Sequence, residues 1–167
     1  MKTKITLVLA FIGMITLNSC TVNEDRVVQN QTPISEVFEV TRSFTAGNNF
    51  ENLINFPYTI YNSDMVLVYR LSGVVQGEDV WKLLPETFFF TDGTLDFGYE
   101  FDFTRFDANI YMIGNDLSSV SNNFRLNQVL RIVIIPANFA NKLNTSTEYK
   151  DVIKYYKIDE SKIKTIQ

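Results

Sequence analysis

Three carboxylates share one face of a predicted strand. Asp96, Glu100 and Asp102 alternate with apolar residues between residues 94 and 104. A strand rises about 3.3 Å per residue, which places Glu100 and Asp102 roughly 7 Å apart. Carboxylates at that spacing can catalyse hydrolysis of a glycosidic bond or supply oxygen ligands to calcium. The same alternation is typical of a solvated sheet face kept soluble by charge, and this is the interpretation we favour.

The chain contains no histidine and one cysteine, Cys20. A serine–histidine or cysteine–histidine nucleophile is therefore excluded, and so is a zinc site built on histidine. A single cysteine also excludes an intrachain disulfide and a thiolate metal cluster. The sequence thus favours a protein that is not an enzyme, and it predicts no cofactor apart from the calcium considered above.

Aromatic side chains are the second class of candidate, since they make up 14% of the chain. Tyr58 and Tyr61 lie beside Pro57 in a predicted loop, where binding residues concentrate. In the run from residue 88 to 90, alternation places Phe89 on the opposite face from its two phenylalanine neighbours. Either both faces are covered there or Phe89 is an exposed contact. We predict contact with a partner protein or a sugar through these three residues, whereas for Trp81 we favour core packing.

The N-terminus has the organisation of an export signal. Lys2 and Lys4 precede an apolar stretch that is too short to span a bilayer comfortably. The stretch ends in Leu17-Asn18-Ser19-Cys20, which resembles the lipobox of bacterial lipoproteins. The resemblance implies that residues 1–19 are a signal peptide and that Cys20 is acylated and becomes the first mature residue. The alternatives are a secretory peptide followed by a chance cysteine, or an uncleaved anchor.

Residues 20–35 form a polar tether after the predicted cleavage site. The acidic pair Glu24-Asp25 resembles the surface-export signal of Bacteroidota lipoproteins. The residue after Cys20 is Thr21, whereas an aspartate at that position would resemble an inner-membrane retention signal. These resemblances imply attachment to the outer membrane, facing the periplasm or the cell surface. An acidic pair also occurs by chance in polar tethers, so the leaflet stays open.

The charge of the chain limits its partners. Its formal net charge is -4, and loss of Lys2 and Lys4 with the signal peptide makes it -6. An acidic chain without a basic patch repels phosphate backbones, so we expect no nucleic-acid partner. Attraction to anionic lipids by charge is disfavoured for the same reason, so the acyl chains on Cys20 must supply membrane attachment.

From Glu36 onward the hydrophobic period is two, which predicts strands. Asp92-Gly93 predicts a two-residue hairpin turn with positive φ at both positions. Near the C-terminus, Thr145 to Glu148 looks like a capping box before a helix with Tyr149, Val152, Ile153 and Tyr156 on one face. Residues 36–167 are therefore predicted to be mainly β, an antiparallel β-sandwich of about seven strands with a short C-terminal helix. The predicted strands cover residues 36–45, 50–56, 65–71, 80–84, 88–91, 94–104, 106–112 and 129–135, and a last short strand is possible within residues 158–166.

Three apolar segments, at residues 64–69, 80–85 and 131–136, resemble parts of small Bacteroidota lipoproteins of uncharacterised function. The resemblance implies a shared fold and carries over no catalytic residues. The function we expect is that of a membrane-anchored binding or assembly module of the cell envelope, with a protein partner or a glycan. The alternative is a carboxylate- or calcium-dependent hydrolase of glycans, and a passive structural lipoprotein is a third possibility.

Overall fold

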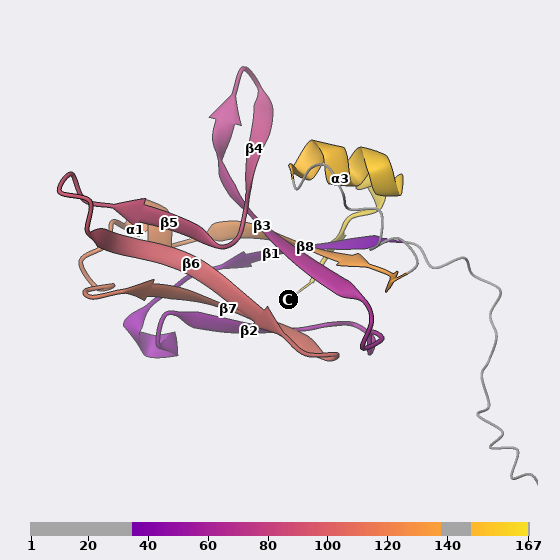
Figure 1. Cartoon of the computed structure of the whole chain (residues 1–167), viewed down its shortest axis with the longest axis horizontal. Helices are drawn as coiled ribbons and strands as arrows, with labels where there is room; N and C mark the ends of the chain where they lie inside the picture. Colours follow the sequence, from indigo (N-terminus) through magenta and orange to yellow (C-terminus); the bar gives the residue numbers. More distant parts are fainter. Residues whose placement is uncertain (1–34, 138–147, 167) are drawn as a thin grey trace, which may run out of the picture. The chain divides into compact units, whose positions relative to one another are not determined.

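The computed structural model describes residues 35–137 and 148–166. Cys20, the predicted signal peptide and nearly all of the predicted tether lie outside the described residues. Within the described part the fold is mainly β, and two sheets pack against each other as a sandwich (Figure 1).

The larger sheet has five strands and is called sheet A. From one edge to the other its order is β4 (Glu78–Leu83), β3 (Met65–Val75), β8 (Gln128–Ile135), β1 (Glu36–Arg42) and β9 (Lys164–Thr165). All neighbours are antiparallel except β1 and β9, which are parallel.

The smaller sheet, sheet B, has four antiparallel strands. Its order is β2 (Glu51–Asn55), β7 (Asp107–Gly114), β6 (Leu95–Phe103) and β5 (Glu86–Phe89). The described helices are short: η1 (Ala46–Asn48), α1 (Asn122–Arg125), α3 (Tyr149–Tyr156) and η2 (Glu160–Lys162).

Sheet A is covered on both faces. Side chains from both sheets fill the space between them, among them Phe38, Val68, Tyr99 and Ile132. On the other face of sheet A, α3 packs its buried residues against a second cluster that includes Leu67, Trp81 and Val133. This double coverage explains why β3 and β8 are apolar on both faces in the sequence.

The predicted β-sandwich with a C-terminal helix is confirmed, but nine strands lie in the described residues rather than about seven. The segments predicted from the sequence overlap all nine strands, including the short β5 and β9, so only the total of about seven was too low. The predicted capping box is wrong. Glu148 is itself the N-cap residue of α3 and makes no side-chain capping bond, and residues 145–147 lie outside the described part.

The predicted two-residue turn at Asp92-Gly93 is also wrong. Phe90 N donates to Thr94 O at 2.9 Å and Gly93 N donates to Phe90 O at 3.0 Å, so the loop has three residues. Gly93 alone has a positive φ, 86°, while the Asp92 carboxylate accepts hydrogen bonds from the Thr94 amide and hydroxyl. The true two-residue turn joins β3 to β4 at Gln76-Gly77, where φ is 54° and 84°.

Candidate functional site

One end of the sandwich carries a rigid aromatic surface, which we call the aromatic end and define as Tyr61, Phe103, Arg105 and Phe106. The β2–β3 loop and the β6–β7 turn meet there. Phe56 N donates to Phe106 O at 2.7 Å and Ile60 N donates to Arg105 O at 2.9 Å. Arg105 Nε donates back to Ile60 O at 3.1 Å. These bonds hold the two loops together as one unit.

The rings of the aromatic end face outward. Tyr61 is 75% exposed, Phe106 58% and Phe103 43%. A shallow hollow of about 260 Å³ lies among them, lined by Ile60, Tyr61, Asn62, Phe103, Thr104 and Arg105. The Arg105 guanidinium carbon lies 5.9 Å from the centre of the Phe106 ring. Tyr61 and Phe103 line one hollow with Arg105, and Phe106 lies beside Arg105, so these exposed rings gather at one end of the sandwich.

Tyr58 plays a different part from Tyr61. Its ring centre lies 6.2 Å from that of the buried Phe38 in an edge-to-face contact. Burial and a hydrogen bond to Glu36 raise the pKa of the Tyr58 hydroxyl. Tyr58 therefore attaches the β2–β3 loop to the start of β1, and the structure separates the two tyrosines that the sequence grouped together.

Phe89 lies at the opposite end of sheet B. It pairs with Leu95, at the other end of β6 from Phe103. Phe88 points inward and stacks on Phe97, with 4.4 Å between ring centres, whereas Phe89 is 61% exposed and Phe90 55%. Of the two alternatives that alternation left open, the structure shows an exposed Phe89 with an exposed neighbour.

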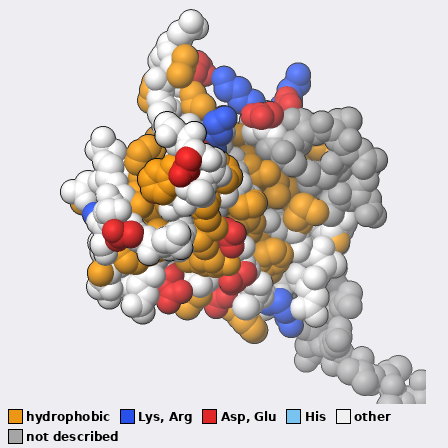
Figure 2. Space-filling model, turned by 60° about the vertical axis from the view of Figure 1, so that its left-hand side comes forward, with side chains coloured by type: hydrophobic (Ala, Val, Ile, Leu, Met, Phe, Trp, Pro, Cys, Tyr) orange, Lys and Arg blue, Asp and Glu red, His pale blue; other side chains and the backbone are white. Residues whose placement is uncertain are grey.

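A second hairpin carries exposed apolar side chains, and the sequence analysis did not identify it as a contact site. β3 pairs with β8 only as far as Arg70 and then continues with β4 alone, so the ribbon projects from the sandwich (Figure 1). Val74 and Val75, beside the turn, are 61% and 60% exposed. Figure 2 shows hydrophobic side chains on this projection and on the body beside it. In the sequence, this site could have been predicted from the two valines that precede the Gln76-Gly77 turn.

We call the tips of these two hairpins the distal hairpins and define them as Val74, Val75, Phe89 and Phe90. The strand register places them away from the aromatic end. Glu36 and Val66 both pair with Ile134, so β1 and β3 start at the same end of sheet A. The β3–β4 turn then lies beyond the other end of that pairing.

The acidic strand lies on the outer face of sheet B, as its alternation predicts. Tyr111 donates to Glu100 Oε2 at 3.3 Å, and burial together with Glu100 raises the pKa of that phenol. Asp102 lines a wide, open hollow of about 550 Å³ with Glu51, Asp107 and Asn109, but Asp96 and Glu100 are not in its lining. The three carboxylates are therefore not gathered around one cavity. Within the described residues no group of three or more acidic side chains is placed to hold a metal ion, and calcium binding stays a prediction.

Two arginines inside apolar strands were missed by the sequence analysis. Arg70 lies between the sheets with 5% of its side chain exposed, and its guanidinium bonds Glu86 at 2.8 Å and Gln128 Oε1 at 3.1 Å. Its guanidinium carbon is 4.8 Å from the centre of the Tyr99 ring. Arg70 continues the inward alternation of Val66 and Val68, and that placement was the signal.

Arg131 occupies the other face of sheet A. Its guanidinium carbon lies 4.1 Å from the Trp81 ring centre, and its nitrogens bond Glu39 and Glu160 at 2.9 Å each. A further bond to the Tyr149 hydroxyl joins α3 to the same group. Trp81 is 8% exposed, in agreement with core packing. The cluster holds the C-terminal segment on the sheet.

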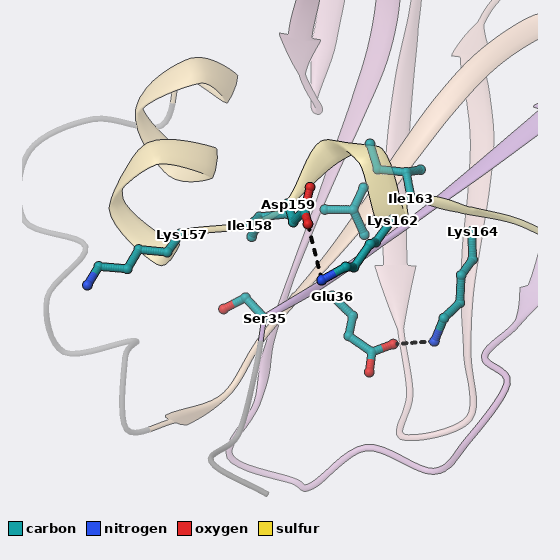
Figure 3. Close-up of a pocket in the computed structure, with 9 residues that line it drawn as sticks. Ser35, Glu36, Lys157, Ile158, Asp159, Lys162, Ile163 and Lys164 are labelled. Atoms are coloured by element: carbon teal, nitrogen blue, oxygen red, sulfur yellow. Dashed lines mark hydrogen bonds and ion pairs between the residues drawn. The ribbon is translucent and has the colours of Figure 1, made fainter.

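A cavity of about 360 Å³ lies between the start of β1 and the C-terminal segment (Figure 3). Val37, Ile158 and Ile163 contribute its apolar lining. Two of its three lysines form ion pairs: Lys162 pairs with Asp159 and Lys164 with Glu36, each at 3.2 Å. The buried Ser35 hydroxyl has no hydrogen-bond partner.

The aromatic end and the distal hairpins offer apolar surface on rigid supports, while the acidic strand does not converge on a pocket. No described helix is both long and apolar enough to cross a bilayer. Comparison with known proteins finds no family model, no curated protein and no solved structure that matches this chain.

Proposed function

We propose that this protein is a lipoprotein of the outer membrane, anchored through Cys20, that acts as a non-catalytic binding module of the cell envelope. The distal hairpins are its contact site, and the partner is a protein. The lipid fixes the location, and the sandwich is a scaffold that presents the hairpins away from the point where the tether enters.

The observation that carries the proposal is the distribution of exposed apolar side chains. Val74, Val75, Phe89 and Phe90 are each more than half exposed and lie on two hairpin tips. Burying exposed apolar surface contributes about 25 cal/mol per Å². Aromatic side chains are also the residues that most often dominate binding energy in protein interfaces. Covering these side chains with a partner would therefore be favourable.

The chemistry of the distal hairpins favours a protein over a glycan. A sugar ring stacks on an aromatic face and needs hydrogen-bonding groups around its hydroxyls. Val74 and Val75 offer neither, although both suit an apolar pocket on a protein. The flanking Glu78 and Asp79 are exposed and would form a polar rim.

The test is site-specific photocrosslinking in intact cells. A benzophenone amino acid replaces Phe89 or Val75 in the full-length chain, and adducts are identified by mass spectrometry. We expect one dominant envelope protein attached to both positions. The matched control is the same amino acid at Ser118, which is exposed on the β7–α1 connection and should give no such adduct.

Two further results would count against the proposal. A Cys20→Ser protein that stays firmly in the membrane fraction would contradict the lipid anchor. Equal labelling of diverse proteins from Phe89 and Ser118 would contradict a specific partner. The hydrolase alternative gains no support from the described residues, because Asp102 lines an open hollow without Asp96 or Glu100, and the three carboxylates do not surround one cavity.

A further inference from the structure

The aromatic end lies where the chain enters the domain. Glu36, the first residue of β1, accepts a hydrogen bond from Tyr58 of the β2–β3 loop, and Phe38 contacts the Tyr58 ring. The same loop carries Tyr61 and is bonded to the turn that carries Phe106. Figure 1 shows the start of β1, this loop and the β6–β7 turn at one end of the sandwich and the β5–β6 hairpin at the other.

The length of chain before Ser35 limits how far this end can lie from an anchored Cys20. Fifteen peptide units separate the two residues in the sequence, and a fully extended chain spans at most about 50 Å over that length. If Cys20 is acylated, as the proposed function requires, the aromatic end lies at the point of the domain whose distance from the bilayer the tether limits most directly.

The side chains of the aromatic end suit the bilayer interface. Tyrosine rings collect at the headgroup level of membranes, where one edge is apolar and the hydroxyl is wet. Phe103 and Phe106 can enter the outer part of the acyl region, while the Arg105 guanidinium matches the geometry of lipid phosphates. The acidic net charge disfavours attraction to anionic lipid, so the contact depends on the rings and needs no anionic headgroup.

Tethering removes the need for a strong contact. A surface linked to the membrane by a short chain experiences a high effective concentration of lipid, on the order of millimolar or more. Three exposed rings on a rigid frame are then enough to keep one orientation populated. The β2–β3 loop that carries Tyr61 is also fixed to the end of β8, because Asp64 accepts hydrogen bonds from the Tyr61 amide at 3.0 Å and the Ala137 amide at 3.4 Å.

From this geometry we infer that the aromatic end is a bilayer-contact surface. Tyr61, Phe103 and Phe106 enter the lipid interface and Arg105 pairs with headgroup phosphate. The domain is thereby held upright with its distal hairpins pointing away from the membrane. This inference rests on the proposed lipid anchor and adds an orientation to it.

The experiment uses full-length lipidated protein in vesicles of zwitterionic phosphatidylcholine, with and without bromine on the acyl chains. Phe106→Trp reports on the aromatic end and Phe89→Trp is the matched control, since the two side chains are similarly exposed at 58% and 61%. The wild-type chain, with the buried Trp81, gives the background. We expect brominated lipid to quench the added fluorescence of Phe106→Trp and to leave Phe89→Trp and the wild type unchanged.

The outcomes separate the inference from the anchor. Protein that does not float with vesicles contradicts the anchor, and the inference falls with it. Protein that floats while Phe106→Trp stays unquenched overturns the inference alone and leaves the aromatic end to a protein partner. Equal quenching of both variants also overturns it, because the domain then has no fixed orientation. Phe103→Trp provides a second reporter should Phe106→Trp fail to fold.

Discussion

The buried ion pair between Arg70 and Glu86 allows a quantitative test of the core. We predict that Glu86→Gln destabilises the protein more than Arg70→Met. In Glu86→Gln the Arg70 charge stays between the sheets, with 5% of its side chain exposed, and loses its counter-ion. In Arg70→Met the remaining Glu86 carboxylate, 18% exposed, can still be hydrated.

The magnitudes follow from the geometry. Opposite charges about 4 Å apart at an effective dielectric constant near 20 attract by about 4 kcal/mol. The glutamine keeps a hydrogen bond worth about 1 kcal/mol, so we expect Glu86→Gln to cost about 3 kcal/mol. Arg70→Met leaves the acceptor Gln128 Oε1 without its donor, at about 1–2 kcal/mol, and an apolar side chain partly offsets that loss.

The assay is equilibrium urea unfolding followed by circular dichroism. With an m-value of about 2 kcal/mol per M, Glu86→Gln should lower the midpoint by about 1.5 M and Arg70→Met by less than about 1 M. The double variant should resemble Arg70→Met, because the buried charge is gone in both. An Arg70→Met midpoint below that of Glu86→Gln would refute the reasoning.

Two other predictions concern alkaline pH and a close contact in sheet B. Burial raises the pKa of the phenols of Tyr69 and Tyr149, and that of Tyr99 to about 12. The unfolded chain ionises first, so the stabilisation is complete below about pH 10 and falls above it by up to about 1.4 kcal/mol per pH unit and group. Unfolding coincident with phenolate absorbance checks this, and phenolate formation in a chain that stays folded would contradict it. Gly98→Ala should cost about 1–3 kcal/mol, because its Cβ would lie 2.9 Å from Glu86 O, whereas Gly47→Ala, with 3.6 Å to its nearest neighbour, should stay within about 0.5 kcal/mol in thermal unfolding.

The sequence predicted the sandwich because alternation survives in its longer strands. Phe97 and Tyr99 point inward and Asp102 outward, as a period of two requires. The turn at Asp92-Gly93 was misjudged because the sequence does not show the bulge between Phe88 and Phe89, which lengthens the loop. The predicted capping box was misleading because it needs Glu148 as the third residue of the helix. In the structure Glu148 is the N-cap residue instead.

The candidate sites were predicted only in part. Alternation is a local property, and it placed Phe89 on the opposite face from its neighbours but left open whether that face is covered; the structure shows Phe89 exposed. Tyr58 differs from Tyr61 because it contacts Glu36 and Phe38, which are distant in the sequence. A local sequence pattern cannot predict such contacts. The two interior arginines were overlooked because an apolar run does not reveal which of its members finds a counter-ion across the sheet.

The position of β1 has a consequence for how the chain folds. Both neighbours of β1 come from the last third of the sequence. Its Glu39 meets Arg131, 92 residues away, and its Glu36 meets Lys164, 128 residues away. Such long-range pairing makes folding slow, on a timescale of about milliseconds to seconds. Until residues 128–135 arrive, β1 and β3 lack the strand that joins them in sheet A and present open edges prone to aggregation. The first strand to emerge therefore waits for the last, and the sandwich closes only once the whole chain is available.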